Sequence, residues 1–314
     1  MGILLDIVIP VFGLVGFGYA ATFTRQFDER AARGLAVFVF QFALPVMLFR
    51  NMAVAELPQS AGAGLLLAYY AGTALVLATA ILAARLLPGA VPGRAAILGF
   101  GSAYGNTVLL GIPLAITALG PEAGPPLYLI IAFHGMSFFT VITVLLELSR
   151  GTRENLRGLP LRTLKGLATN VILVSIVSGL LWQLLAGSLP PVIDRWAELI
   201  GRAALPCALF SMGASLRSYR IAGALGPALY VVLAKLVVHP LVVALFVLVL
   251  VPLPPLWAQV AIISAALPVG VNVYLFAGRY GVGEAETATA ILLSTLLGVV
   301  SLSVVLALLG LGTR

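Results

Sequence analysis

The stretch from Gly101 to Leu114 reads Gly-Ser-Ala-Tyr-Gly-Asn-Thr-Val-Leu-Leu-Gly-Ile-Pro-Leu and lies inside an apolar segment long enough to span a bilayer. Its composition works against a continuous helix, because Pro113 cannot donate a backbone hydrogen bond, three glycines weaken the helix, and Asn106 adds a polar amide. Irregular backbone at membrane depth is tolerated only where protein covers it or where it lines a wet cavity. The stretch therefore indicates a broken helix beside a solute pathway.

A second stretch of this kind runs from Leu267 to Gly281 and reads Leu-Pro-Val-Gly-Val-Asn-Val-Tyr-Leu-Phe-Ala-Gly-Arg-Tyr-Gly. It again places a proline, a glycine and an asparagine within an apolar segment. We expect the backbone to break in both stretches. The residues that we assign to shaping these breaks are Gly105, Gly111, Pro113, Pro268 and Gly270.

The overall composition is that of an all-α polytopic membrane protein. Of the 314 residues, 61% are hydrophobic and only 9% are charged, so most of the exterior must face hydrocarbon. The net charge of +7 does not indicate a nucleic-acid partner, because the basic residues lie singly at segment ends. A single cysteine, Cys207, excludes an internal disulfide and a cysteine-based metal site, and we expect neither metal nor cofactor.

The apolar segments predict ten spanning helices at about 20 residues for each span. The fourth and the ninth contain the two interrupted stretches. The expected spans cover residues 4–23, 34–52, 62–87, 94–119, 127–148, 166–186, 200–216, 221–251, 256–280 and 284–311.

The ten spans divide into two repeats of five, residues 1–156 and 157–314. The sequence Ala43–Phe49, Ala-Leu-Pro-Val-Met-Leu-Phe, matches Ala204–Phe210, Ala-Leu-Pro-Cys-Ala-Leu-Phe. The same displacement carries the first broken stretch onto the second. Because each half has an odd number of spans, the two copies must enter the membrane in opposite directions, which makes the repeat inverted.

The basic residues also predict the orientation. With both termini on the periplasmic or extracellular side, the cytoplasmic connections hold 13 Lys and Arg, and the outer connections hold Arg50, Arg195, Arg202 and Arg314. This imbalance follows the positive-inside rule. The sequence therefore predicts a multi-pass protein of the inner membrane with both ends outside.

The chain resembles the auxin efflux carrier (PIN-like) transporters of the bile-acid/auxin transporter group, over essentially its whole length. The resemblance rests on the segment Asn106–Pro113 with its Gly-Ile-Pro-Leu ending, on Leu267–Asn272 followed by Arg279-Tyr280-Gly281, and on the ten-span count. The short connection from Arg150 to Lys165 resembles bacterial members, because plant members have a long cytoplasmic segment there.

This resemblance implies a mechanism and an assembly. Two broken helices would cross at mid-membrane, helices three to five and eight to ten would form a transport domain, and helices one, two, six and seven would form a scaffold that dimerises. It further implies movement of small organic anions, auxin-like or dicarboxylate, by an elevator-type alternating-access mechanism.

The expected substrate site follows from the physics of a broken helix. Unsatisfied N–H groups at a half-helix N-terminus carry roughly half a positive charge, which suits a carboxylate. We assign substrate binding to the polar side chains in or near the two breaks. These are Asn106, Asn272, Thr107, Ser102 and Tyr274. The alternative interpretation is that these groups only satisfy the interrupted backbone.

Ionisable residues within the spans are few. Lys235 is interpreted either as a cation that supports the substrate site or as a structural group bonded to carbonyls of the crossing. His239, one helical turn further on, is interpreted as a proton-coupling residue or as a bonded packing residue, and His134 has the same two interpretations.

Three other functions are kept as alternatives. A sodium-coupled organic-anion symporter of the bile-acid type would need sodium bound by carbonyls and amides, because no Asp or Glu lies near the centre of a span. A channel would need a continuous pore, which two antiparallel broken helices would block. A membrane enzyme would need a convergent nucleophile and base or a metal cluster, so we expect no enzyme activity.

Overall fold

A computed structural model describes residues 4–24, 27–55, 61–87, 89, 91–149, 159–219 and 225–311. Within these ranges the chain is helical, and its one β-type contact is an isolated bridge. Six helices are long and apolar enough to cross a membrane, namely Glu29–Ala53, Gly62–Ala84, Pro121–Ser149, Pro191–Leu216, Leu225–Leu250 and Glu284–Leu308. Four shorter apolar helices accompany them, at Asp6–Ala21, Thr107–Leu119, Val171–Ala186 and Pro255–Ala266. The fold is that of a multi-pass membrane protein, as its composition predicts.

In the first half, short π-helical turns come directly before prolines. Pro45, for example, lies two residues after η2, inside the continuous helix Glu29–Ala53, where its missing N–H removes one hydrogen bond of the helix. The elements are η1 (Leu4–Val8), α1 (Ile9–Ala21), α2 (Glu29–Phe38), η2 (Val39–Ala43), α3 (Leu44–Ala53), α4 (Ala61–Ala84), α5 (Arg94–Ala103), η3 (Thr107–Gly111), α6 (Ile112–Leu119), η4 (Pro121–Ala123) and α7 (Gly124–Ser149).

The second half has a similar succession of elements. They are α8 (Leu159–Ala168), α9 (Val171–Ala186), α10 (Pro191–Leu216), α11 (Leu225–Leu233), η6 (Ala234–Val238), α12 (His239–Leu245), η7 (Phe246–Leu250), α13 (Pro255–Ala266), α14 (Asn272–Tyr280) and α15 (Glu284–Leu308). The prediction of one continuous sixth span over residues 166–186 is wrong, because α8 ends at Ala168 and α9 begins at Val171. Asn170 caps the new helix by accepting a hydrogen bond from the Leu173 N–H at 3.2 Å.

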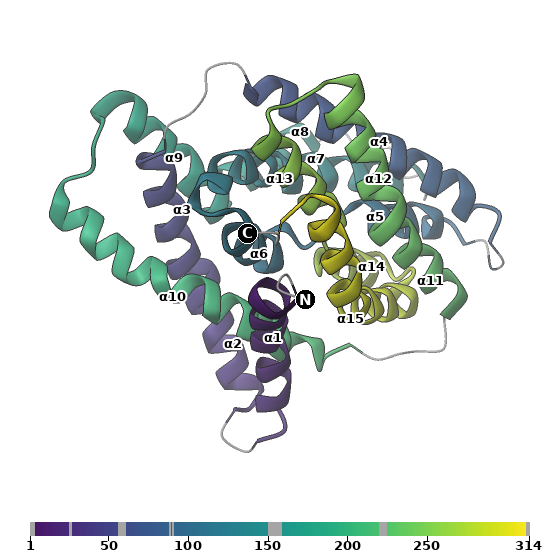
Figure 1. The fold of residues 1–314 in the computed structure, drawn as a ribbon. Coiled ribbons are helices and arrows are strands. Elements are labelled where there is room, and N and C mark those ends of the chain that lie inside the picture. Colours follow the sequence, from purple (N-terminus) through teal and green to yellow (C-terminus); the bar gives the residue numbers. More distant parts are fainter. Residues whose placement is uncertain are drawn as a thin grey trace.

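Two groups of helices can be followed in Figure 1. On one side α1, α2, α3 and α9 gather along the long α10, and on the other side α4, α5, α7 and α11 to α15 lie together. The packing agrees with this view, because α1 contacts α10 and α3 contacts α9, whereas α4 contacts α5 and α12 contacts α13.

Small residues let α1 and α10 approach closely. A Cβ atom at Gly213 would overlap the carbonyl oxygen of Val15, and one at Gly18 would overlap that of Phe210. Such close backbone contact is how helices associate in a bilayer, where lipid competes for apolar side chains. These two glycines therefore fix how the first helix lies against α10.

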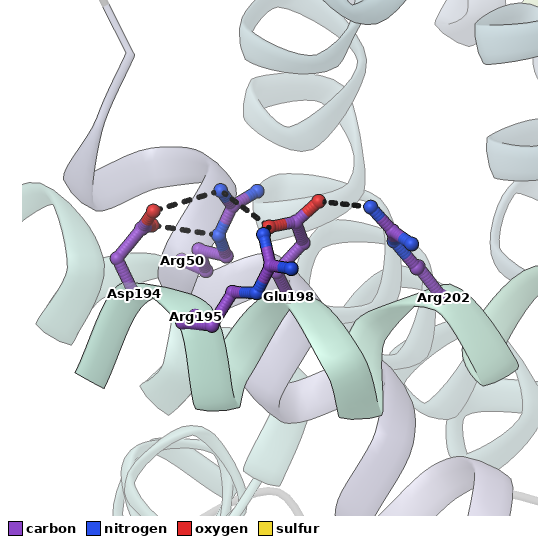
Figure 2. A network of polar contacts seen from close by, with 5 residues as sticks. All are labelled: Arg50, Asp194, Arg195, Glu198 and Arg202. Carbon is purple, nitrogen blue, oxygen red and sulfur yellow. Dashed lines mark hydrogen bonds and ion pairs between the residues drawn. The ribbon is translucent and has the colours of Figure 1, made fainter. Parts of the chain in front are cut away.

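A network of charged side chains joins α3 to α10 (Figure 2). The Arg50 guanidinium donates two hydrogen bonds to the Asp194 carboxylate, at 2.7 and 3.1 Å, and lies 4.0 Å from Glu198. Glu198 also accepts a hydrogen bond from Arg202 at 2.6 Å. Because the Arg50 and Asp194 side chains are partly exposed, the network sets the register of the two helices more than it stabilises them.

Part of the predicted organisation lies outside the described residues. The proposed boundary between the repeats, at residues 156 and 157, is one such place. The count that gives the orientation also includes basic residues outside these ranges, namely Arg25, Arg150, Arg153, Arg157, Arg220 and Arg314.

Candidate functional site

Both interrupted stretches leave the helical conformation. Helix α5 ends at Ala103, the backbone of Tyr104 is extended with φ −95° and ψ 113°, and the chain becomes helical again at Thr107. Helix α13 ends at Ala266, the backbone of Leu267 is extended, and α14 begins at Asn272. Each break therefore leaves a few residues whose backbone groups need partners outside a helix.

The two breaks supply these partners to each other. The Asn106 N–H donates to the Pro268 carbonyl at 2.9 Å, and the Gly270 N–H donates to the Tyr104 carbonyl at 3.0 Å. These bonds form an antiparallel bridge between Gly105 and Val269. The structure thus brings the two stretches into direct contact, and we call this place the crossing.

Glycines allow the crossing to be this tight. A Cβ atom at Gly270 would lie 2.6 Å from the Tyr104 ring and 3.0 Å from the Gly105 carbonyl oxygen. A Cβ atom at Gly111 would lie 2.7 Å from the Leu267 side chain. Pro113 lies two residues after the π-helical turn η3, inside the continuous helix Thr107–Leu119, so its missing N–H removes one hydrogen bond of that helix.

The two asparagines begin the second half of each broken helix. Asn106 precedes η3 and its side-chain amide donates to the Met212 sulfur of α10 at 3.4 Å. Asn272 is the first residue of α14 and its amide donates to the Tyr104 hydroxyl at 2.9 Å. Among the described residues, neither side-chain carbonyl oxygen accepts a hydrogen bond, so both oxygens can take another partner.

A cavity of about 700 Å³ opens at the crossing. It lies between the crossing, α7, and the helices α2, α9 and α10. The described residues that line it are Ala36, Val37, Phe40, Gln41, Tyr104, Gly105, Asn106, Thr107, Val108, Leu109, Ile131, Ala132, His134, Gly135, Phe139, Thr169, Asn170, Val171, Ile172, Leu173, Ser211, Ser215, Gly270, Val271, Asn272 and Leu275. Its volume lies in the usual range of small-molecule sites, roughly 300 to 1,000 Å³.

The lining is mostly apolar, and its polar side chains are amides, hydroxyls and the ring of His134. Within the described residues the lining holds no Asp, Glu, Lys or Arg. The starts of η3 and α14 both belong to the lining, and the first N–H groups of a helix have no partner within that helix. Some of these groups already have partners in the breaks, since the Thr107 N–H donates to the Gly105 carbonyl at 2.9 Å and the Val273 N–H to the Gly270 carbonyl at 3.1 Å. The positive ends of two helix dipoles and the side-chain amides are therefore the features of the lining that suit an anion.

Three of the predicted substrate residues, Asn106, Thr107 and Asn272, line this cavity. Three others lie elsewhere and are absent from its described lining. The Ser102 hydroxyl donates to the Leu98 carbonyl within α5, and Tyr274 packs edge-on against Tyr219. Lys235 is fully buried and donates to the Ala265 carbonyl at 2.5 Å.

The two histidines occupy different places. His134 lines the cavity, and its ring stacks on the Tyr104 ring with centroids 4.5 Å apart. His239 is fully buried away from the described lining, and its Nε2 lies 3.0 Å from the Thr73 hydroxyl oxygen. His239 therefore has a bonded partner on α4 and no contact with the cavity.

Sequence reasoning did not single out several polar residues of the lining. Ser211 and Ser215 come from α10, Gln41 from η2, and Asn170 from the cap of α9. The signal for the two serines was their spacing of one helical turn inside an apolar span, which puts both on one face. Tyr104 was quoted within the first stretch, but its contacts with Asn272 and His134 depend on the tertiary fold.

Comparison with known proteins places the whole chain. Residues 3–306 match the family described as "Membrane transport protein". The chain is 30% identical over 300 residues to a protein of Rhizobium meliloti (strain 1021) named "Putative malonate transporter", covering 95% of this chain and 93% of that protein. It is 22% identical over 342 residues to "Auxin efflux carrier component 8" of Arabidopsis thaliana, covering 92% of each. The chain therefore belongs to the membrane transport family that includes the auxin efflux carriers, and it is a transporter rather than an enzyme.

Proposed function

We propose that this protein is a secondary transporter of small organic anions and that it binds them at the crossing. The observation that carries the proposal is the cavity, where two helix starts and two asparagine amides converge without a carboxylate among the described lining residues. A carboxylate substrate would accept hydrogen bonds from Asn106, Asn272 and the Thr107 hydroxyl. A cation would meet the wrong end of both helix dipoles there.

A small dicarboxylate is the substrate class to test first. The name of the bacterial relative, which covers nearly the whole chain, supports malonate as the probe. Each carboxylate of such a molecule can face one of the two helix starts, since these belong to different breaks. The plant relative's name supports an auxin-like acid as the second probe.

The proposed architecture has ten spans in two inverted repeats, residues 1–156 and 157–314. The six long and four shorter apolar helices support this number. The succession of elements supports the repeat, because the broken α5–η3–α6 of the first half corresponds to the broken α13–α14 of the second. In this scheme each repeat contributes one half of the crossing.

The proposed movement is of the elevator type. Helices α1, α2, α3, α9 and α10 would form a scaffold that dimerises, and the helices around the crossing would move past it. The position of the cavity supports this division, because it lies between α10 of one group and the crossing of the other. Sliding the crossing along the scaffold would expose the same site to each side of an inner membrane, with both termini outside.

Uptake by purified protein in proteoliposomes tests the function. We expect uptake of labelled malonate above that of protein-free vesicles, and competition by other small carboxylates but not by malonamide, its uncharged analogue. Absence of malonate and auxin uptake, or equal competition by malonamide, would reject an anion carrier.

Asparagine variants test the site. We expect Asn106→Ala and Asn272→Ala each to lower uptake by about tenfold or more, because each variant loses one hydrogen bond to the charged substrate. Asn51→Ala is the matched control, because Asn51 also donates to a tyrosine hydroxyl, that of Tyr128, at 2.8 Å but lies outside the described cavity lining. If the control lowers uptake as much as the other two variants do, the assignment of the site is wrong.

A further inference from the structure

Lys235 lies behind the crossing. It belongs to η6, its side chain is fully buried, and its ammonium donates to the Ala265 carbonyl at 2.5 Å. A Cβ atom at Gly105 would lie 3.3 Å from the Lys235 Nζ and 3.3 Å from the Ser264 carbonyl oxygen. The ammonium is therefore held between the last turn of α13 and the break of the other broken helix.

This place has the character of a cation site. Helix α13 ends at Ala266, so its last carbonyls have no intrahelical partner and carry the negative end of the helix dipole. In transporters built from broken helices, such half-helix C-terminal carbonyls coordinate the coupling cation. At this crossing the carbonyl of Ala265 accepts a hydrogen bond from a side-chain ammonium instead.

No acidic partner accounts for the position of Lys235. In the described part of the chain no carboxylate forms an ion pair with it. Two histidines lie nearby: His239 is one turn along the same helix, and His134 on α7 lines the cavity together with Gly105. A charged lysine buried in a membrane span is expensive, and here the described partner that stabilises it is a backbone carbonyl, that of Ala265.

We propose that the Lys235 ammonium is a tethered cation that fills the cation position of the crossing, so that anion transport by this protein needs no sodium. The inference deepens the proposed function and rests on it for its transport consequence. The ammonium neutralises the end of α13 on one side of the crossing. Because Gly105 has no side chain, the same charge also favours an anion in the cavity on the other side.

Replacing the charge tests the proposal. The Lys235→Ala variant lacks the ammonium and has an empty space in its place. A small cation from solution can enter this space from the cavity, past Gly105. We expect malonate uptake by this variant in choline chloride to fall about tenfold, the size of one lost ion–dipole contact. Ethylammonium chloride or sodium chloride should restore part of it, whereas uptake by the unmodified protein should be the same in all three salts.

Thermal stability gives a readout that needs no transport. We expect ethylammonium to raise the melting temperature of detergent-solubilised Lys235→Ala relative to choline. It should leave the unmodified protein and Lys165→Ala unchanged, since Lys165, the other lysine of the chain, is exposed on α8. If the unmodified protein takes up no anion, the proposed function is wrong. The change in melting temperature with ethylammonium still decides whether the site of Lys235 holds a cation.

Three results would overturn the proposal. One is sodium-dependent uptake by the unmodified protein. Another is a Lys235→Ala variant whose melting temperature and uptake respond to neither ethylammonium nor sodium. This holds even if the variant in choline is less stable than the unmodified protein. The third is a Lys235→Gln variant that behaves as the unmodified protein does, because an uncharged N–H donor to Ala265 would then suffice.

Discussion

The two breaks have similar sequences but different surroundings. After the first break the chain restarts through the π-helical η3, and the Asn106 amide reaches Met212 on α10, outside the crossing. After the second break α14 begins directly, and the Asn272 amide is held inside the crossing by the Tyr104 hydroxyl. The first asparagine thus connects the crossing to the neighbouring helix group, and the second fixes the crossing itself.

The backbone of the second break is also held more firmly. Its Val269 N–H donates to the Ser294 hydroxyl of α15 at 3.0 Å, and Gly270 lies against the Tyr104 ring. At the first break, the atoms closest to where a Cβ atom of Gly105 would lie are the Lys235 Nζ and the Ser264 carbonyl oxygen, both at 3.3 Å. We infer that the second break is the more rigid half of the crossing and the first the more adaptable one.

The largest expected effect comes from Gly270→Ala. Its methyl group would lie 2.6 Å from the Tyr104 ring and 3.0 Å from a backbone oxygen, so the crossing must open. We expect a loss of about 3 kcal/mol in the free energy of unfolding and loss of uptake. Gly105→Ala, which meets its nearest atoms at 3.3 Å, should cost clearly less, and equal losses in a denaturation series would contradict the difference between the breaks.

The next effect concerns the support of the second break. Ser294→Ala leaves the buried Val269 N–H without its acceptor, so we expect a loss of about 1 to 3 kcal/mol in the free energy of unfolding. The matched control is Ser303→Ala on the same helix, because the Ser303 hydroxyl donates to the carbonyl of Val299, one turn back in the same helix. A melting temperature that falls equally in both variants would show that Ser294 supports nothing special.

A smaller effect separates the roles of the two asparagines. Tyr104→Phe removes the acceptor of Asn272 but no described hydrogen bond of Asn106. In double-mutant cycles on malonate affinity, we expect Tyr104→Phe and Asn272→Ala to be coupled by about 1 kcal/mol. Tyr104→Phe and Asn106→Ala should be nearly additive, and the opposite pattern would exchange the roles given to the two residues.

The smallest effect should come from the charged network of α3 and α10, which lies away from the crossing (Figure 2). Asp194→Asn weakens the ion pair with Arg50. The side chains of Arg50 and Asp194 are 24% and 33% exposed. We expect a change below about 1 kcal/mol in the free energy of unfolding, decreasing with added salt, and unchanged malonate affinity. A change in affinity as large as that of Asn106→Ala would place the network in the transport path.

The sequence predicted the class of the fold and the places where the two helices break. Proline, glycine and asparagine inside an apolar run are local signals, and they suffice to locate both interruptions. The partners across the crossing could not be predicted in this way. These contacts depend on how distant helices pack. They are Asn106 with Met212, Asn272 with Tyr104, and Lys235 with Ala265.

The limits of local reasoning are also visible in the sixth expected span. The apolar run from Gly166 to Ala186 reads as one helix, but α8 ends at Ala168 and Asn170 caps a new helix. Asparagine is a strong N-cap and could have been read as a helix start. Before it, however, Gly166 is only a weak break signal, and the run from Gly166 to Ala186 holds no charged residue at which hydropathy would divide it.

Equilibrium binding of labelled malonate to the purified protein tests most directly that the crossing of the two breaks is an anion site. The account predicts saturable binding to the unmodified protein and to Asn51→Ala. It predicts loss of this binding in the double variant Asn106→Ala/Asn272→Ala while the helical content, measured by circular dichroism, stays the same. Undiminished affinity in the folded double variant would contradict it.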